Sequence, residues 1–191
     1  KNLDPEESIG WDVGIEQSLF QEKLSLGITY FNNEFDDLIE FESGTSRYIN
    51  VAEAETQGVE VFASLRPIDG LTFLASYTYT DTENSETGKD LLRRAENKFA
   101  LNVNYQFMDR GNVNLNLVYV GKRDDNDYSV WPAARVELDK YLLANLALSY
   151  DITGNIQVFG RVENLLDEDY EEVKGFGTPE LSAFGGCRLS F

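Results

Sequence analysis

The chain has 191 residues, of which 42% are hydrophobic, and its net charge is -18, with no histidine. The length fits one ordinary domain, and the acidic excess argues against nucleic acid as a partner, because phosphate binding needs clusters of Lys and Arg. No apolar run reaches the roughly 18 residues that a membrane helix needs, which excludes helical spans but not the strands of a barrel.

Apolar and polar residues alternate along most of the chain, which predicts about nine strands and almost no helix. In chain order we expect strands at residues 11–20, 23–41, 48–66, 71–79, 98–107, 112–119, 142–150, 156–163 and 183–191. The pattern is clearest at 98–107. One face of that strand carries Phe99, Leu101, Val103, Tyr105 and Phe107, and the other carries Lys98, Ala100, Asn102, Asn104 and Gln106.

The connections between these strands are of two kinds, and the two kinds alternate. Short turns are expected at residues 20–22, 67–70, 109–111 and 151–154, where Gly, Asp or Pro mostly supplies turn geometry. Long polar segments are expected at roughly 33–47, 82–96, 123–139 and 166–182. This alternation predicts an antiparallel up-and-down meander with all of its long connections at one end.

Alternation alone does not decide whether the apolar face points into a soluble core or into lipid. The asymmetry of the connections favours lipid, because outer-membrane barrels have short turns on one side and long loops on the other. Aromatic residues near the strand ends, such as Tyr79 and Tyr119, are typical of the two membrane interfaces. We therefore predict an all-β, antiparallel, up-and-down segment of a transmembrane β-barrel.

Two segments resemble a known family. Residues 160–170, which include Asn164-Leu-Leu-Asp167 and Tyr170, look like a motif near the end of TonB-dependent outer-membrane receptors. Residues 2–8 resemble the entry to the C-terminal part of these barrels, and the chain ends in Phe191, as they do. Within the family, residues 55–60, 91–95 and 123–129 are most similar to cobalamin receptors.

The resemblance implies a barrel of about twenty-two strands with an N-terminal plug. Residues 1–191 would supply about nine of these strands as one partial domain, with the plug absent. The implied function is import of cobalamin or another corrinoid across a Gram-negative outer membrane, energised through the TonB complex. A ferric-siderophore receptor of the same architecture is the alternative, and a non-transport or soluble β-barrel binding protein is a third interpretation.

Further partners also follow from the resemblance. Outer-membrane lipid and lipopolysaccharide would contact the barrel, and Phe191 would be read by the barrel assembly machinery. No cofactor is implied. An enzyme is not expected, because the chain has no histidine and no serine or cysteine with a plausible base. The single cysteine, Cys187, excludes an internal disulfide.

Arg93 and Tyr128 are the predicted ligand-binding residues, because they match contact positions of cobalamin receptors. Arginine offers a fork of donors to amide or phosphate oxygens, and tyrosine offers an apolar ring with a hydroxyl tip. The structural alternatives are an arginine paired with a nearby acid, such as Asp90 or Glu96, and a tyrosine at the membrane interface. Arg94 and Trp131 are neighbours with weaker claims.

Acidic clusters occur at residues 36–37, 124–127 and 167–169. Calcium binds six to eight oxygens held close together, and none of these clusters has the spaced ligands of a dedicated calcium loop. We expect solvated loop charge there and no metal site.

Overall fold

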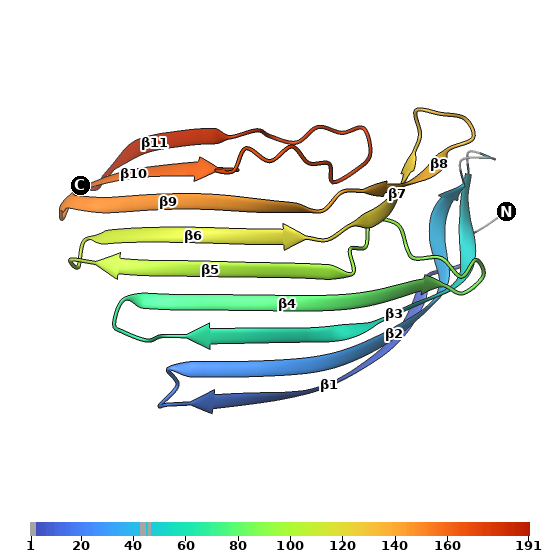
Figure 1. Ribbon diagram of the computed structural model, residues 1–191, viewed down its shortest axis with the longest axis horizontal. Helices are drawn as coiled ribbons and strands as arrows, with labels where there is room; N and C mark the ends of the chain where they lie inside the picture. Colours follow the sequence, from blue (N-terminus) through green and yellow to red (C-terminus); the bar gives the residue numbers. More distant parts are fainter. Residues whose placement is uncertain (1–2, 43–44, 46) are drawn as a thin grey trace.

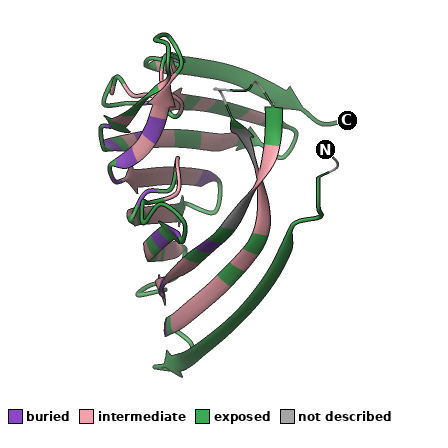
Figure 2. Cartoon of the chain, turned by 90° about the vertical axis from the view of Figure 1, so that its right-hand side faces the viewer, coloured by how far each residue is buried: buried purple, intermediate pink, exposed green. Residues whose placement is uncertain are grey.

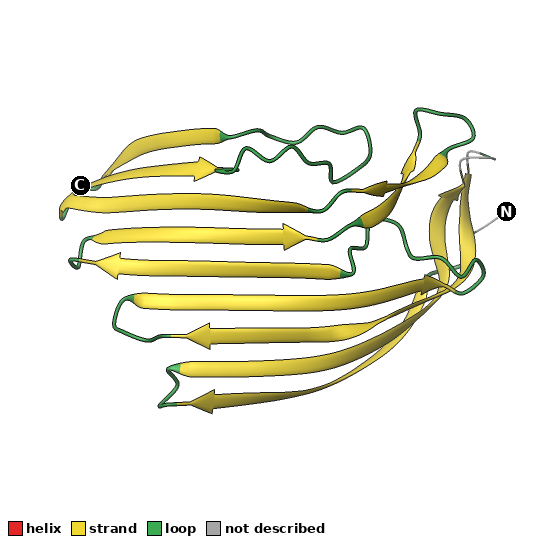
Figure 3. Cartoon of the chain, in the orientation of Figure 1, coloured by secondary structure: helices red, strands yellow, loops and turns green. Residues whose placement is uncertain are grey.

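The computed structural model describes residues 3–42, 45 and 47–191, and within them it contains strands, turns and loops but no helix (Figure 3). The strands are β1 (Glu7–Leu19), β2 (Leu24–Glu42), β3 (Arg47–Leu65), β4 (Leu71–Asn84), β5 (Asn97–Phe107), β6 (Gly111–Val120), β7 (Arg123–Asp127), β8 (Ala134–Leu138), β9 (Tyr141–Thr153), β10 (Ile156–Glu163) and β11 (Ser182–Leu189). No helix in these residues is long and apolar enough to cross a membrane.

Nine of the strands form one antiparallel sheet in the order β1-β2-β3-β4-β5-β6-β9-β10-β11 (Figure 1). Each strand therefore pairs with its neighbour in the chain, except that the β7–β8 hairpin is inserted between β6 and β9. The sheet is open, with β1 and β11 at its two edges. The predicted antiparallel up-and-down barrel segment is confirmed.

The short turns lie at one end of the sheet and the long connections at the other, as the sequence predicts (Figure 1). The long loop expected at residues 33–47 is wrong, however. Pairing between β2 and β3 continues without a loop from Leu24 opposite Leu65 to Glu42 opposite Arg47. Polar residues fit in this part of β2 and β3 because the paired strands satisfy the backbone hydrogen-bonding groups and the side chains pair across the strands, as when Asn33 Nδ2 donates to Thr56 Oγ1 at 3.4 Å.

The sheet is a single layer without a packed apolar core. Among the described residues, the buried hydrophobic ones are Ala54, Ala95, Leu138, Tyr141 and Ala144 (Figure 2). Large apolar side chains such as Trp11, Ile15 and Leu148 are instead exposed on one face of the sheet. Folded soluble domains bury such a face against a second layer. This face is free to meet lipid.

The opposite face carries a ladder of asparagines across β5, β6 and β9. Asn102 lies opposite Asn116 and Asn104 lies opposite Asn114, and the diagonal neighbours Asn102 and Asn114 exchange two hydrogen bonds of 3.2 and 3.0 Å between their amide groups. Asn112 donates to Asn104 at 3.1 Å, and Asn145 donates to Asn116 at 3.5 Å. We refer to these six side chains as the amide ladder.

Candidate functional site

Three long connections meet at one end of the sheet (Figure 1). They are the β4–β5 connection at residues 85–96, the β6–β9 connection at 121–140, which contains the β7–β8 hairpin, and the β10–β11 connection at 164–181. Hydrogen bonds and ion pairs between them make this end the best candidate for a binding site, because scaffold-held loops usually carry such sites.

Arg93 lies in the β4–β5 connection and is attached to the β7–β8 hairpin at two points. Its backbone, in a left-handed conformation with φ of 60°, donates its N–H to the carbonyl oxygen of Asp124 at 2.7 Å. Its Nε donates to Oδ1 of Asp125 at 2.8 Å. The acid that pairs with Arg93 is therefore Asp125, not Asp90 or Glu96. The Arg93 side chain is 41% exposed, and its role in ligand binding remains a prediction.

Asp125 connects all three long connections. Its side chain is 0% exposed. Oδ1 accepts hydrogen bonds from Arg93 Nε and the Asn126 amide, both at 2.8 Å, and Oδ2 accepts one from the Lys174 amide at 2.8 Å. Burial alone would raise the pKa of this carboxyl, but the hydrogen bonds from the amides of Lys174 and Asn126 and from Arg93 hold the pKa below its ordinary value. We call Asp125, Arg93 and the Lys174 amide the Asp125 junction.

Arg135 also attaches the hairpin to the β4–β5 connection. Arg135 on β8 forms an ion pair with Asp124 on β7, with Nε and Oδ2 2.6 Å apart. The same guanidinium donates from Nη2 to the carbonyl oxygen of Asp90 at 2.7 Å. The base of the hairpin is therefore held by two arginines, one on each side of the contact.

The tip of the β7–β8 hairpin exposes apolar side chains. Tyr128 is 51% exposed and Trp131 is 73% exposed, and Val130 between them is also exposed. The hydroxyl of Tyr128 accepts a long hydrogen bond of 3.4 Å from Asn126 Nδ2. The structure thus joins Arg93 to the hairpin that carries Tyr128, although no contact links the two side chains in the described residues. Arg94 is exposed.

Asn164, in the motif at 160–170, closes the β10–β11 connection. It is 5% exposed, and its Nδ2 donates to the carbonyl oxygens of Glu168 at 2.9 Å and Pro179 at 3.2 Å. Its Oδ1 accepts the Glu168 amide at 2.9 Å. Asp167 Oδ1 accepts a further hydrogen bond from the Leu181 amide at 3.0 Å. The motif therefore fixes both ends of this connection against each other.

The β10–β11 connection folds back over the face that carries the amide ladder. Tyr170 packs on Tyr141 with ring centroids 4.4 Å apart, and the Arg123 guanidinium lies 5.2 Å from the centre of the Tyr141 ring. Arg123 also donates from Nη2 to the carbonyl oxygen of Glu171. These contacts hold the β10–β11 connection against the face of the sheet that carries the amide ladder.

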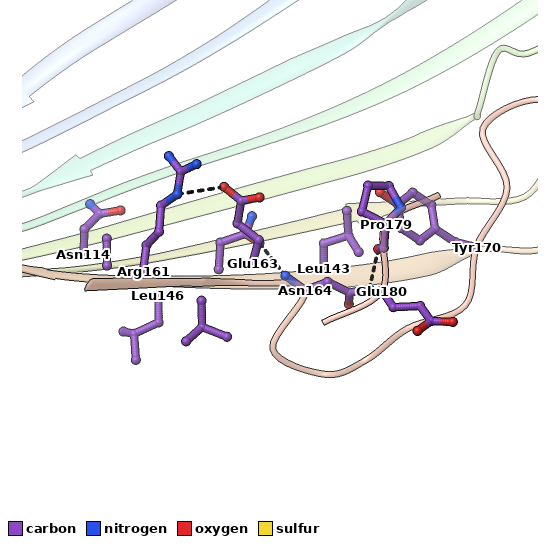
Figure 4. Close-up of a pocket in the computed structure, with 12 residues that line it drawn as sticks. Asn114, Leu143, Leu146, Arg161, Glu163, Asn164, Tyr170, Pro179 and Glu180 are labelled. Carbon is purple, nitrogen blue, oxygen red and sulfur yellow. Dashed lines mark hydrogen bonds and ion pairs between the residues drawn. The ribbon is translucent and has the colours of Figure 1, made fainter. Parts of the chain in front are cut away.

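A cavity of about 300 Å³ lies under this connection (Figure 4). Arg161 and Glu163 point into it from β10 and form an ion pair with Nε and Oε1 3.2 Å apart. Asn114 of the amide ladder lies on the same side, whereas Leu146 points away from them, to the opposite side of the sheet (Figure 4). The cavity thus combines the charged pair Arg161 and Glu163 with a lining that is mostly apolar.

The sequence alone does not identify the residues that organise this end. Asp125 was expected to be solvated charge, and that expectation is wrong because three donors surround it. Asn164 was noted only as part of a motif. In the described part of the chain, no group of His, Cys, Asp or Glu is arranged to hold a metal ion.

A protein-family model described as "TonB dependent receptor-like, beta-barrel" matches residues 1–165. The chain belongs to the TonB-dependent receptor β-barrel family. The family fits the open antiparallel sheet and its exposed apolar face, and it places the chain in the outer membrane of a Gram-negative bacterium. Its members are transport receptors and not enzymes.

Solved structures of TonB-dependent receptors have the same fold. The ferripyoverdine receptor of the Pseudomonas aeruginosa outer membrane is 21% identical, with a TM-score of 0.82 over 100% of this chain. The ferric enterobactin receptor of P. aeruginosa is 24% identical, with a TM-score of 0.78 over 97% of the chain. The ferric-catecholate import receptor Fiu of E. coli is 19% identical, with a TM-score of 0.76 over 99%. The chain spans 28%, 31% and 28% of these three proteins, respectively.

Proposed function

We propose that residues 1–191 form the C-terminal part of the barrel of a receptor that imports a ferric siderophore. The observation that carries this proposal is the match to the receptor barrel family together with structural similarity to receptors for pyoverdine and enterobactin. These structures favour the siderophore over the cobalamin that the sequence resemblance first suggested. Cobalamin remains the second candidate, supported by the segments at 55–60, 91–95 and 123–129.

In this proposal the ligand binds outside the membrane, against the joined long connections. Arg93 presents a partly exposed guanidinium, and the hairpin tip presents Tyr128 and Trp131. A cation with several donors and exposed aromatic rings suits a chelate that has oxygen-rich edges and flat apolar parts. Arg93 and Tyr128 are therefore the residues we assign to ligand contact.

The remaining parts of the proposal concern the whole receptor. The barrel has about twenty-two strands around an N-terminal plug, and TonB acts on the plug to release the ligand inward. The barrel assembly machinery recognises Phe191. Lipid and lipopolysaccharide contact the apolar face.

Binding titrations of the complete receptor test the ligand. Ferripyoverdine, ferric enterobactin and cyanocobalamin are added to the receptor in detergent, and binding is followed calorimetrically. We expect at least one ferric siderophore to bind at micromolar concentration or below, and Tyr128→Ala to weaken that binding. Binding of cyanocobalamin alone would favour the second candidate, and no binding of any of the three would contradict both.

A further inference from the structure

The Asp125 junction joins a predicted ligand residue to a loop far away in the chain. One oxygen of the buried carboxylate holds Arg93 of the β4–β5 connection, and the other holds the backbone of Lys174 in the β10–β11 connection. We propose that Asp125 is a positioning residue: it orients Arg93 toward the ligand and couples that contact to the β10–β11 connection. This inference rests on the proposed siderophore function.

The geometry of Arg93 suits such a role. A guanidinium has five N–H donors in one plane, and Asp125 engages only Nε. In the described part of the chain, neither Nη atom has a hydrogen-bond partner, and the side chain is 41% exposed. Because the backbone N–H also donates to Asp124, Arg93 is held both at its backbone and at Nε of its side chain. Its Nη edge is left for oxygen atoms of a ligand.

Oδ2 of Asp125 accepts a hydrogen bond from the backbone of a small folded segment at residues 171–175. Lys174 forms an ion pair with Glu171 at 2.8 Å, and the same carboxylate accepts the Gly175 amide at 3.0 Å. Glu171 is itself attached to the hairpin, because its carbonyl oxygen accepts a hydrogen bond from Arg123. A ligand that pulls on Arg93 therefore acts on the same carboxylate that holds the segment at 171–175.

A purely structural role for Asp125 predicts different behaviour from a positioning role. If Asp125 acts through Arg93, removing its charge costs nothing further once Arg93 is gone. If Asp125 only stabilises the fold of the loops, its loss weakens binding equally with and without Arg93. A double-mutant cycle separates the two cases.

The cycle uses the complete receptor with Arg93→Gln, Asp125→Asn and the double variant, titrated with ferric enterobactin and ferripyoverdine. Loss of a charged hydrogen bond typically weakens binding about ten- to hundredfold. We expect a loss in this range for each single variant and no additional loss in the double variant. Asp127→Asn is the matched control, because it removes an equal charge from the same hairpin, and in the described part of the chain its carboxylate accepts hydrogen bonds only from Ser129. It should bind within about twofold of the unmodified receptor.

A readout without ligand tests the coupling itself. Hydrogen exchange at the backbone amides of Arg93 and Lys174 should accelerate together in Asp125→Asn and stay unchanged in Asp127→Asn. Unchanged exchange in Asp125→Asn, or an additive loss of binding in the double variant, would overturn the inference. If no probe binds even the unmodified receptor, the proposed function fails, and hydrogen exchange still decides whether Asp125 couples the two connections.

Discussion

Asn164 shows how one side chain can hold a long loop together. Its amide group makes three hydrogen bonds to the backbone of the loop that follows it, and it is almost completely buried. Asparagine suits this position because a single side chain offers donors and an acceptor, and because it tolerates the left-handed φ of 49° found here.

Replacing this side chain should loosen the loop. Asn164→Ala removes the partner of part-buried backbone groups of Glu168 and Pro179, and such a loss costs up to about 1–3 kcal/mol where the group stays shielded from water. We expect limited proteolysis of the complete receptor to cleave within residues 164–181 much faster. Glu168→Ala is the control, because Glu168 takes part through its backbone, and it should be cleaved at the unmodified rate. Equal rates in all three proteins would contradict the assigned role.

The charge of Asp125 predicts how the loops respond to acid. Its pKa in the folded state lies below the ordinary value of 3.8, so its stabilisation is fully present above that value and is lost as the pH falls through the lowered pKa. The Asp125 junction should therefore stay intact from neutral pH to about pH 4 and open only in stronger acid.

Spin labels on two connections can follow this opening. Glu86→Cys and Phe176→Cys, in a receptor with Cys187→Ser, place labels on the β4–β5 and β10–β11 connections. The distance between the labels should be constant from pH 7 to 4 and spread below that range. Asp125→Asn should give the broad distribution at every pH. A transition near pH 6 would show that another group controls the junction.

At the scale of the element, β5 presents two surfaces of opposite character. Phe99, Leu101 and Val103 share the apolar face, and Asn102 and Asn104 form part of the amide ladder on the other. Successive side chains of a strand point to opposite faces of the sheet, so adjacent positions have different surroundings. In the proposed receptor the apolar side of β5 faces lipid.

Two neighbouring lysine substitutions test this orientation. Leu101→Lys places a charge toward the middle of the lipid layer, which costs about 2–4 kcal/mol in barrels of this kind. Asn102→Lys places an equal charge on the polar face and should cost about 1 kcal/mol or less. Denaturant unfolding of the complete receptor in lipid vesicles measures both. Equal costs, or a larger cost for Asn102→Lys, would reverse the assignment of the faces.

The nine long strands were predictable because alternation persists over many residues and each strand pairs with its neighbour in the chain. The outer halves of β2 and β3 were assigned to a loop because their residues are polar, yet pairing along the backbone does not require apolar side chains. The β7–β8 hairpin is not predicted because β7, Arg123–Asp127, is a run of charged and polar residues without apolar alternation.

The site was predictable only in part, for a related reason. The sequence predicts Arg93 and Tyr128 separately, each from its own segment, and both lie at the end of the sheet that carries the long connections. The contacts of Asp125 could not be deduced, because they join residues 32 and 49 positions apart in the chain. A single sequence does not say which loops meet, so a buried carboxylate looks the same as a solvated one.

At the scale of the whole molecule, the sheet is one layer with two open edges. β1 and β11 leave backbone groups unpaired, and the apolar face has no second layer to cover it. Such edges and faces promote association with other chains in water.

The isolated 191-residue chain should therefore require an amphiphile to stay dispersed. Without detergent we expect sedimentation as large aggregates, and in detergent micelles or lipid vesicles a dispersed, strand-rich protein. Analytical ultracentrifugation and circular dichroism measure the two properties. A monodisperse monomer that unfolds cooperatively in plain buffer would contradict the assignment of the apolar face to lipid.

The amide ladder has a consequence for anything that moves along it. Each of its six asparagines is already hydrogen-bonded to another one, and none of them carries a charge. A polar body sliding past meets amide groups that each already have a partner within the wall, so each has fewer donors and acceptors left to offer. The inner wall at β5, β6 and β9 is in this sense a low-friction surface: wettable, but weakly adhesive.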